Sequence, residues 1–227
     1  MSNLLNIKFP ATSQTFYPDS SKPQTKAALD RIYAQYKDAI DRSSQLTKVP
    51  KEIITSFIFI ESNGNPTAIS GAGAVGVMQL VPSSASDILV IENTHKRLSQ
   101  DEKDILGNAI GARFTDGILK MRYLGDKVTV AGVTSATWIT KTDLVKPSLN
   151  ILIGSIYLGI LIDESSKNGK IDLHKVVIRY NKGYFADGQG KQIPDTVEEA
   201  LANTNTESKN YILKLMGKNG TLDTMLA

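Results

Sequence analysis

The chain has 227 residues, of which 41% are hydrophobic and 22% are charged, and its formal net charge is +3 at neutral pH. This composition is that of an ordinary globular protein that can bury a core, and it excludes a disordered or fibrous chain. The sequence contains no cysteine, which excludes disulfides and thiolate chemistry. The small excess of positive charge suits an acidic polymer such as a bacterial wall, but it does not select a partner.

The N-terminal part is predicted to hold an irregular lead-in and then two helices. Residues 1–23 contain Pro10, Pro18, Pro23 and many serines and threonines, which favour irregular structure. Apolar residues recur at helical spacing from Lys26 to Arg42. Pro50 suits the first turn of the second helix, because an N–H group there would have no partner in the helix. No basic start, long apolar run or small-residue cleavage site is visible, so we expect no secretory signal.

The second helix is predicted to present a carboxyl group at the end of an apolar face. Ile53, Ile54, Phe57 and Ile60 mark this face, and Glu61 follows Phe57 by four residues, which places it on the same side. Contact with hydrocarbon disfavours the charged carboxylate and raises its pKa. A general acid that works near neutral pH requires such a shift. The alternative is a solvated glutamate at a helix end, which is the more frequent role for this residue type.

A long ordered pattern of small and polar residues follows this glutamate. It reads Glu61-Ser62-x-Gly64-Asn65-Pro66-x-Ala68-x-Ser70, then Gly73-Ala74-x-Gly76-x-Met78-Gln79 and Pro82. This segment is too long and too regular in its glycine, asparagine and serine positions to be an ordinary turn. Pro82 then opens a short helix.

The middle of the chain combines a helix signal with a β-rich stretch. Ser99 and Glu102 form a capping-box pattern before a helix that we expect to extend to Met121, although glycines weaken it. Residues 125–142 are rich in valine and threonine and predict a small β-hairpin. Trp138 lies in this stretch, either as an anchor of the core or hairpin or as a platform for a sugar ring.

The C-terminal part is predicted to be helical. Leu149 to Ile162 is too short and too polar for a membrane span and is interpreted as a buried helix. Asp172 precedes a helix that ends in Arg179-Tyr180-Asn181-Lys182-Gly183. Further helices are expected to begin at Asp195 and Thr206.

These blocks together resemble the soluble lytic transglycosylase (SLT) domain of glycoside hydrolase family 23, which is related to goose-type lysozyme. The residues that carry the resemblance are the Glu61–Pro82 pattern, Asn150-x-x-x-Gly154-x-x-Tyr157, the Tyr180-Asn181 block, and Glu207-x-x-x-Tyr211. Arg179 and Lys182 replace two alanines of the family's Ala-Tyr-Asn-Ala-Gly block. The resemblance implies a mainly α-helical, lysozyme-like fold with a small β-hairpin insertion. It implies one catalytic domain over residues 24–227, interrupted by an insertion at about 91–147.

The resemblance also implies a reaction, the cleavage of the β-1,4 bond between N-acetylmuramic acid and N-acetylglucosamine in peptidoglycan. In this family one glutamate protonates the glycosidic oxygen and then acts as base on the 6-hydroxyl of the same N-acetylmuramic acid, which closes a 1,6-anhydro ring. Glu61 would be that acid/base, and Tyr180 would approach it and help set its protonation state. Glycosidases generally use two carboxylates, whereas this mechanism needs one. Asp87 is the nearest candidate in sequence for a second carboxylate, but Asp87 and Glu207 are interpreted as caps or surface groups because no motif surrounds either of them.

Four further residues receive roles from the resemblance. Ser70, Gln79 and Asn181 would hydrogen-bond the sugar or its N-acetyl groups. Met78 would line the floor of the cleft. Plain core packing is the alternative for Met78 and for Tyr180.

No cofactor, metal or nucleic-acid site is predicted. His95 and His174 have no cysteine or paired histidine at ligand spacing. Gly71-x-Gly73-x-x-Gly76 matches a dinucleotide fingerprint but does not follow a strand of a βαβ unit. Basic residues do not alternate with aromatic ones as a nucleic-acid surface would require. The expected partner is therefore the glycan strand of peptidoglycan.

Two other functions remain open from the sequence. A hydrolytic muramidase of the same fold would leave a reducing end, and a non-catalytic peptidoglycan-binding module would keep the fold without cleavage. We expect the chain to act at the peptidoglycan or periplasm as a virion-associated or phage-released protein. A component of a secretion machine is the alternative, and virion or secretion-machine proteins would be further partners.

Overall fold

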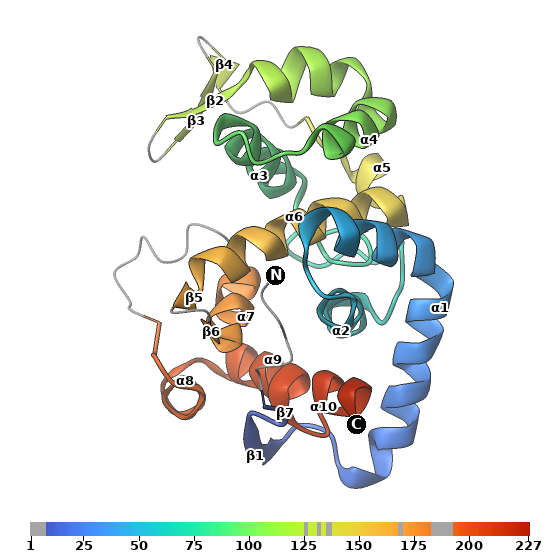
Figure 1. The fold of residues 1–227 in the computed structure, drawn as a ribbon, viewed down its shortest axis with the longest axis vertical. Coiled ribbons are helices and arrows are strands. Elements are labelled where there is room, and N and C mark those ends of the chain that lie inside the picture. Colours follow the sequence, from blue (N-terminus) through green and yellow to red (C-terminus); the bar gives the residue numbers. More distant parts are fainter. Residues whose placement is uncertain (1–7, 125–126, 131–132, 135–137, 168–169, 183–192) are drawn as a thin grey trace.

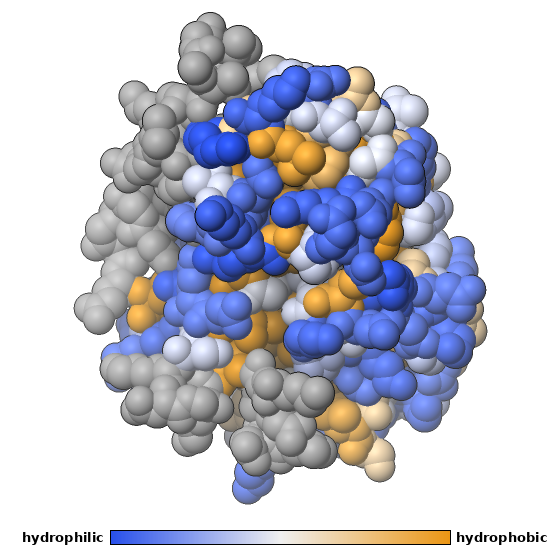
Figure 2. Space-filling model, turned by 45° about the horizontal axis from the view of Figure 1, so that its top comes forward, coloured by the Kyte–Doolittle hydropathy of each residue, from blue (hydrophilic) through white to orange (hydrophobic). Residues whose placement is uncertain are grey.

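Helices dominate the computed structural model, which describes residues 8–124, 127–130, 133–134, 138–167, 170–182 and 193–227. Figure 1 shows α6 crossing the middle of the molecule, with α3, α4 and the β2–β4 strands on one side of it and α7 to α10 on the other. The face seen in Figure 2 is mostly hydrophilic, and its hydrophobic residues lie in separate patches. The helices are α1 Lys22–Thr47, α2 Lys51–Ser62, α3 Pro82–Thr94, α4 Gln100–Ile110, α5 Lys141–Leu144, α6 Pro147–Glu164, α7 Leu173–Lys182, α8 Val197–Asn203, α9 Thr206–Met216 and α10 Thr221–Leu226.

The strands are short and lie at the periphery. β2 (Arg122–Leu124), β3 (Lys127–Val130) and β4 (Val133–Thr134) form an antiparallel sheet in which Tyr123 pairs with Val128 and Val130 with Val133. β5 (Ser166–Lys167) pairs with β6 (Lys170–Ile171), and β1 (Thr12–Thr15) pairs in parallel with β7 (Gly217–Lys218). The mainly α-helical, lysozyme-like fold with a small β element is confirmed. The β element is a three-stranded meander and not a simple hairpin.

The central helix α6 is buried because it is apolar on every side. By length and composition alone it could cross a membrane, but 72% of it is buried inside the molecule. It packs against α1, α3 and α7, and residues from Leu149 to Ile162 contribute to the core. This placement confirms the prediction of a buried core helix.

Several boundaries differ from the sequence-based expectation. The lead-in contains β1, whose partner β7 lies near the other end of the chain. α4 ends at Ile110, because Gly111 adopts a left-handed φ of +57°. A π-helical turn (Arg113–Gly117) and a 3₁₀ turn (Ile118–Lys120) follow it. α8 begins after Thr196, which forms a capping box with Glu199.

Trp138 packs onto the end of this irregular helical segment. A Cβ atom on Gly117 would lie 2.6 Å from the indole ring, so the ring rests directly on the glycine backbone. The Trp138 backbone N–H donates to Ser86 Oγ at 3.0 Å, and its indole N–H contacts the Met121 sulfur. These contacts favour the role of a packing anchor for the segment that precedes α5.

Asn150 links α6 to the loop between α2 and α3. Its side chain is fully buried, and its oxygen accepts a hydrogen bond from the Met78 N–H at 2.8 Å. Its amide nitrogen donates to the carbonyl oxygens of Val75 and Leu144, each at 2.9 Å. Gly76 has a φ of +83°, and a Cβ atom there would lie 2.4 Å from the Asn150 nitrogen. The loop therefore approaches α6 too closely for any residue with a side chain at position 76.

We expect Asn150→Ala to lower the free energy of unfolding by about 3 kcal/mol, because the buried Met78 N–H and Leu144 carbonyl lose the side chain that bonds them, and the Val75 carbonyl keeps only the Leu80 N–H. Urea unfolding followed by circular dichroism measures this change. Asn203→Ala is the matched control, because Asn203 is exposed and makes one bond to Glu199. Equal losses in the two variants would contradict the structural role of Asn150.

Candidate active site

A cavity of about 650 Å³ opens where α2 ends and lies between α3 on one side and α7 and α9 on the other. Its walls combine carboxyl groups, aromatic rings and small loop residues. The lining residues are Glu61, Ser70, Ala72, Ala74, Gln79, Leu80, Val81, Ser84, Asp87, Ile88, Ile91, Tyr157, Tyr180, Asn181, Lys182 and Glu207. The structure thus brings Glu61, Ser70, Gln79, Tyr180 and Asn181 together around one space, although they come from three separate segments: α2, the loop that follows it, and α7.

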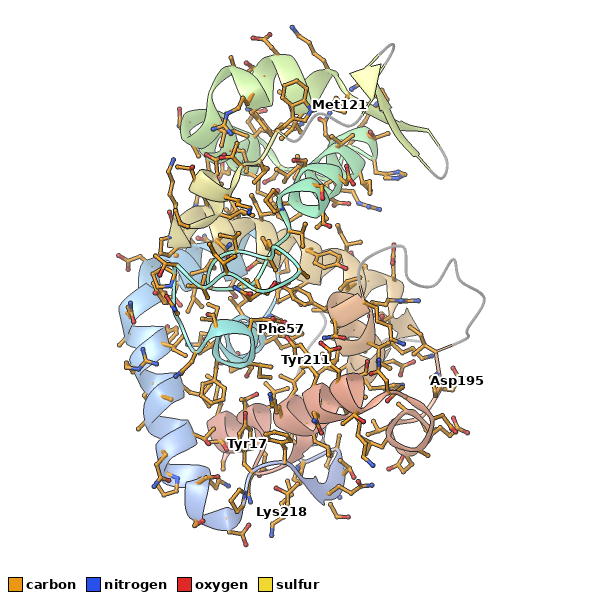
Figure 3. The ribbon with its side chains drawn as sticks, turned by 180° about the vertical axis from the view of Figure 1, so that it is seen from behind. Tyr17, Phe57, Met121, Asp195, Tyr211 and Lys218 are labelled. Atoms are coloured by element: carbon orange, nitrogen blue, oxygen red, sulfur yellow. The ribbon has the colours of Figure 1, made fainter. Side chains whose placement is uncertain are left out.

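Glu61 lies in the last turn of α2, which ends where Asn63 adopts the left-handed conformation. Three aromatic residues cluster beside it: the Phe57 ring lies 4.8 Å from that of Tyr180 and 5.6 Å from that of Tyr211, between centroids, and the Tyr211 hydroxyl contacts the Glu61 carboxyl group. Figure 3 shows Phe57 and Tyr211 close together between α2 and α9. Burial among these rings removes water from the carboxylate and raises the pKa of Glu61 to about 7.

Tyr211 makes the direct contact with this carboxyl group. Its hydroxyl donates to Glu61 Oε1 at 2.6 Å. Burial raises the pKa of Tyr211 well above 10, so the phenol stays neutral and can only donate to a carboxylate. This bond and the charge of Lys214 lower the pKa of Glu61, but the effect of burial is larger. The result is a carboxyl group that is held in place and still half protonated at neutral pH.

Tyr180 was expected to approach Glu61, but its hydroxyl has another partner. It donates to the Met78 carbonyl oxygen at 2.7 Å, and the ring stacks near that of Tyr157 with 5.1 Å between centroids. Tyr180 still lines the cavity beside Glu61. The residue that sets the orientation of Glu61 by a hydrogen bond is therefore Tyr211. The hydrogen bond from the Tyr180 hydroxyl to the Met78 carbonyl oxygen holds the buried Tyr180 side chain in the wall of the cavity.

Comparison with known proteins agrees with this geometry. Residues 38–112 match the family described as Transglycosylase SLT domain. Residues 38–112 therefore resemble an SLT-type transglycosylase domain. Over 50 residues it is 42% identical to membrane-bound lytic murein transglycosylase E of Buchnera aphidicola, covering 22% of this chain and 23% of that protein. Over 51 residues it is 41% identical to endo-type membrane-bound lytic murein transglycosylase A of Klebsiella pneumoniae, covering 22% and 25%.

A longer and weaker similarity extends beyond the SLT segment. Over 188 residues the chain is 25% identical to endo-type membrane-bound lytic murein transglycosylase A of an Enterobacter species, covering 82% of this chain and 72% of that protein. The more similar segments span only about a quarter of the first two relatives.

The three polar residues expected to bind the sugar all line the cavity, and each also has an internal partner. Gln79 donates from Nε2 to the carbonyl oxygens of Gly76 at 2.9 Å and Ala68 at 3.1 Å. Ser70 Oγ accepts from the Ala74 N–H at 3.0 Å. Asn181 Nδ2 donates to Glu207 Oε1 at 3.1 Å. Their roles toward a sugar stay predictions, and the internal bonds fix the shape of the wall.

Met78 was expected to line the floor of the cleft, but the structure places its side chain in the core. Met78 is fully buried, and a Cβ atom on Gly154 of α6 would lie 2.5 Å from its sulfur. Gly154 is therefore the position where α6 makes room for the methionine. Only the backbone carbonyl of Met78 serves the site, as the acceptor for Tyr180.

Met78→Ala is accordingly expected to lower the free energy of unfolding by about 2–5 kcal/mol through the cavity that it leaves. Thermal or urea unfolding checks this. Met225→Ala provides the comparison, since Met225 is only partly buried and should cost less. A stable Met78→Ala protein would contradict the core role and restore the cleft contact.

Three residues of the site were missed or undervalued in the sequence. Glu207 and Tyr211 are four residues apart on α9, and this spacing places both on one helix face. Glu207 lines the cavity, and Tyr211 contacts Glu61. The Glu-x-x-x-Tyr pattern was thus the available signal. Asp87 also lines the cavity, where a surface or capping role was expected. Its sequence context gave no comparable signal.

The buried state of Glu61 has a consequence for stability. Its folded-state pKa of about 7 lies above its ordinary value of 4.5, so between these pH values the folded protein binds more protons than the unfolded chain. The free energy of unfolding should therefore fall as pH rises through this window, by about 3 kcal/mol, and stay level above it. Urea unfolding from pH 4 to 8 measures the change. Glu61→Gln should lack this fall, and a matching fall in the variant would assign it to other groups.

Proposed function

We propose that the protein is a peptidoglycan lytic transglycosylase in which Glu61 is the acid/base. The observation that supports this most is a carboxyl group kept partly protonated near neutral pH at the edge of a cavity large enough for sugar rings. A protonated carboxyl group can donate to a glycosidic oxygen, which leaves with the proton as a hydroxyl group. The names of the relatives, lytic murein transglycosylases, support the same substrate class.

The chemistry then needs the resulting carboxylate to act as a base. Glu61 would take the proton from the 6-hydroxyl of the N-acetylmuramic acid, and the oxygen would attack the anomeric carbon and close the 1,6-anhydro ring. Tyr211 supports both steps, because its neutral hydroxyl orients the Glu61 carboxyl group. Its hydrogen bond also stabilises the carboxylate that exists after the first step and before the second. The reaction consumes no water and needs no second carboxylate, because the proton that Glu61 gives to the glycosidic oxygen is replaced by the proton of the 6-hydroxyl.

Hydrolysis by the same site is the second candidate, and one observation favours it. Asp87 and Glu207 line the cavity together with Glu61, and inverting glycosidases use a second carboxylate to activate water. Glu207 already accepts a hydrogen bond from Asn181. Hydrolysis would leave a reducing end on the product.

Product analysis separates these functions. Purified sacculi are incubated with the protein, and the released muropeptides are examined by mass spectrometry. The proposal expects 1,6-anhydro muropeptides, which are lighter than hydrolysed products by one water. Reducing ends alone would establish the muramidase, and binding to sacculi without release would establish a non-catalytic module. Peptidoglycan is the partner in each case, and a virion or secretion machine that delivers the protein stays a prediction.

A further inference from the structure

Asp87 is a carboxyl group in the cavity for which the proposed reaction has no use. It lies on α3, where Ser84, Asp87, Ile88 and Ile91 follow one another at helical spacing and line the cavity. Figure 1 and Figure 3 show α3 and α9 on opposite sides of α6. Asp87 on α3 and Glu207 on α9 line the same cavity.

The other buried acids near α3 differ from Asp87 in having an internal partner. These pairs are Glu92 with Arg97, Asp143 with Arg113, and Glu102 with Ser99. Among the residues that the structure describes, no group donates a hydrogen bond to Asp87 and no cation lies within ion-pair distance of it. Of the three acids that line the cavity, Glu61 accepts a hydrogen bond from Tyr211 and Glu207 accepts one from Asn181, whereas Asp87 has no such donor among the described residues.

This arrangement has an energetic cost. Asp87 is half-buried next to Ile88, and burial raises its pKa because the charged form loses hydration. A polar group that is removed from water without a partner destabilises the fold. A ligand that donates a hydrogen bond into the cavity would relieve this cost, which is a common property of binding sites.

We propose that Asp87 is a substrate-recognition residue that accepts a hydrogen bond from an N–H group of the peptidoglycan strand. This inference rests on the proposed function. A carboxylate is an acceptor only, so its ligand must be a donor. Peptidoglycan offers N–H donors from two sources, the N-acetyl amide of a sugar and the amide or amino groups of the stem peptide. Either source would make Asp87 a determinant of which strands the cavity holds.

The test is a steady-state comparison of Asp87→Ala with the native protein on two soluble substrates, glycan strands with stem peptides and the same strands stripped of peptide. We expect KM to rise roughly 10- to 100-fold, as for a lost hydrogen bond to a charged group, with little change in kcat. A rise on both substrates assigns the donor to the sugar. A rise on peptide-bearing strands alone assigns it to the stem peptide.

Two controls separate this role from structural effects. Ser83→Ala lies on the same helix outside the cavity lining and should leave KM unchanged. The Tm of Asp87→Ala should equal or exceed that of the native protein, because an uncompensated acid is removed. An unchanged KM on both substrates, or a loss confined to kcat, would overturn the inference. A native protein that releases no muropeptide would instead overturn the proposed function.

Discussion

Glu61→Gln is expected to abolish the release of muropeptides while the protein still folds and binds sacculi. Glutamine has the size of glutamate, and its side-chain oxygen can accept the hydrogen bond that Tyr211 now gives to Oε1. It has no proton of suitable pKa to donate to a glycosidic oxygen. Loss of a general acid typically costs about 10²- to 10⁴-fold in rate, and here the same group also serves as the base. Turbidity loss and muropeptide release measure activity, and co-sedimentation measures binding.

Glu52→Gln is the matched control for this experiment. Glu52 lies in the first turn of the same helix and is absent from the cavity lining, so the same chemical change should leave the rate within about twofold, as surface changes usually do. Retention of more than about a tenth of the native rate by Glu61→Gln would contradict the assignment of Glu61 as general acid. Loss of both binding and lysis with an unchanged fold would place Glu61 in substrate binding alone.

Tyr211→Phe is expected to lower activity and to move the alkaline limb of the pH profile to higher pH. The hydroxyl bond favours the carboxylate form of Glu61 and lowers its pKa, so removal of the hydroxyl should raise that pKa further above about 7. Activity requires the protonated acid, so the limb follows the pKa. Loss of orientation should reduce kcat/KM roughly 10- to 100-fold across the profile. The measurement is kcat/KM from pH 5 to 9.

Tyr180→Phe is the informative comparison. The Tyr180 hydroxyl bonds the Met78 carbonyl, so its removal leaves a buried acceptor unpaired and should lower stability by about 1–3 kcal/mol. The alkaline limb should stay in place. If Tyr180→Phe shifts the limb and Tyr211→Phe does not, the tyrosine expected from the sequence controls Glu61 after all.

Local periodicity explains what the sequence could predict. The apolar face of α2 identifies Glu61 as a carboxyl group next to hydrocarbon, since four-residue spacing alone determines which side chains share a helix face. The apolar content of α6 identifies a core helix, since a helix that is apolar on every side is buried. The ordered loop pattern marks the segment around Gly76 as unusual, but it does not show that this glycine packs against Asn150 of α6.

Contacts between distant segments explain what it could not predict. Tyr211 reaches Glu61 across 150 positions of sequence, and no local pattern shows that α9 packs on α2. Whether Met78 faces the cleft or the core depends on a turn in which Gln79 has a positive φ of 48°. The pairing of β1 with β7 joins the two ends of the described chain. In each case tertiary packing decides between alternatives that the local sequence leaves equal.

The proposed role of Glu61 depends on burial that keeps its carboxyl group protonated near neutral pH, and NMR titration of the side-chain carboxyl carbon measures this property. The signal is assigned by its disappearance in Glu61→Gln. We expect the Glu61 signal to titrate with a midpoint of about 7. A midpoint near the ordinary value of 4.5 would contradict it, because the group would then be a carboxylate under the conditions in which it must donate a proton.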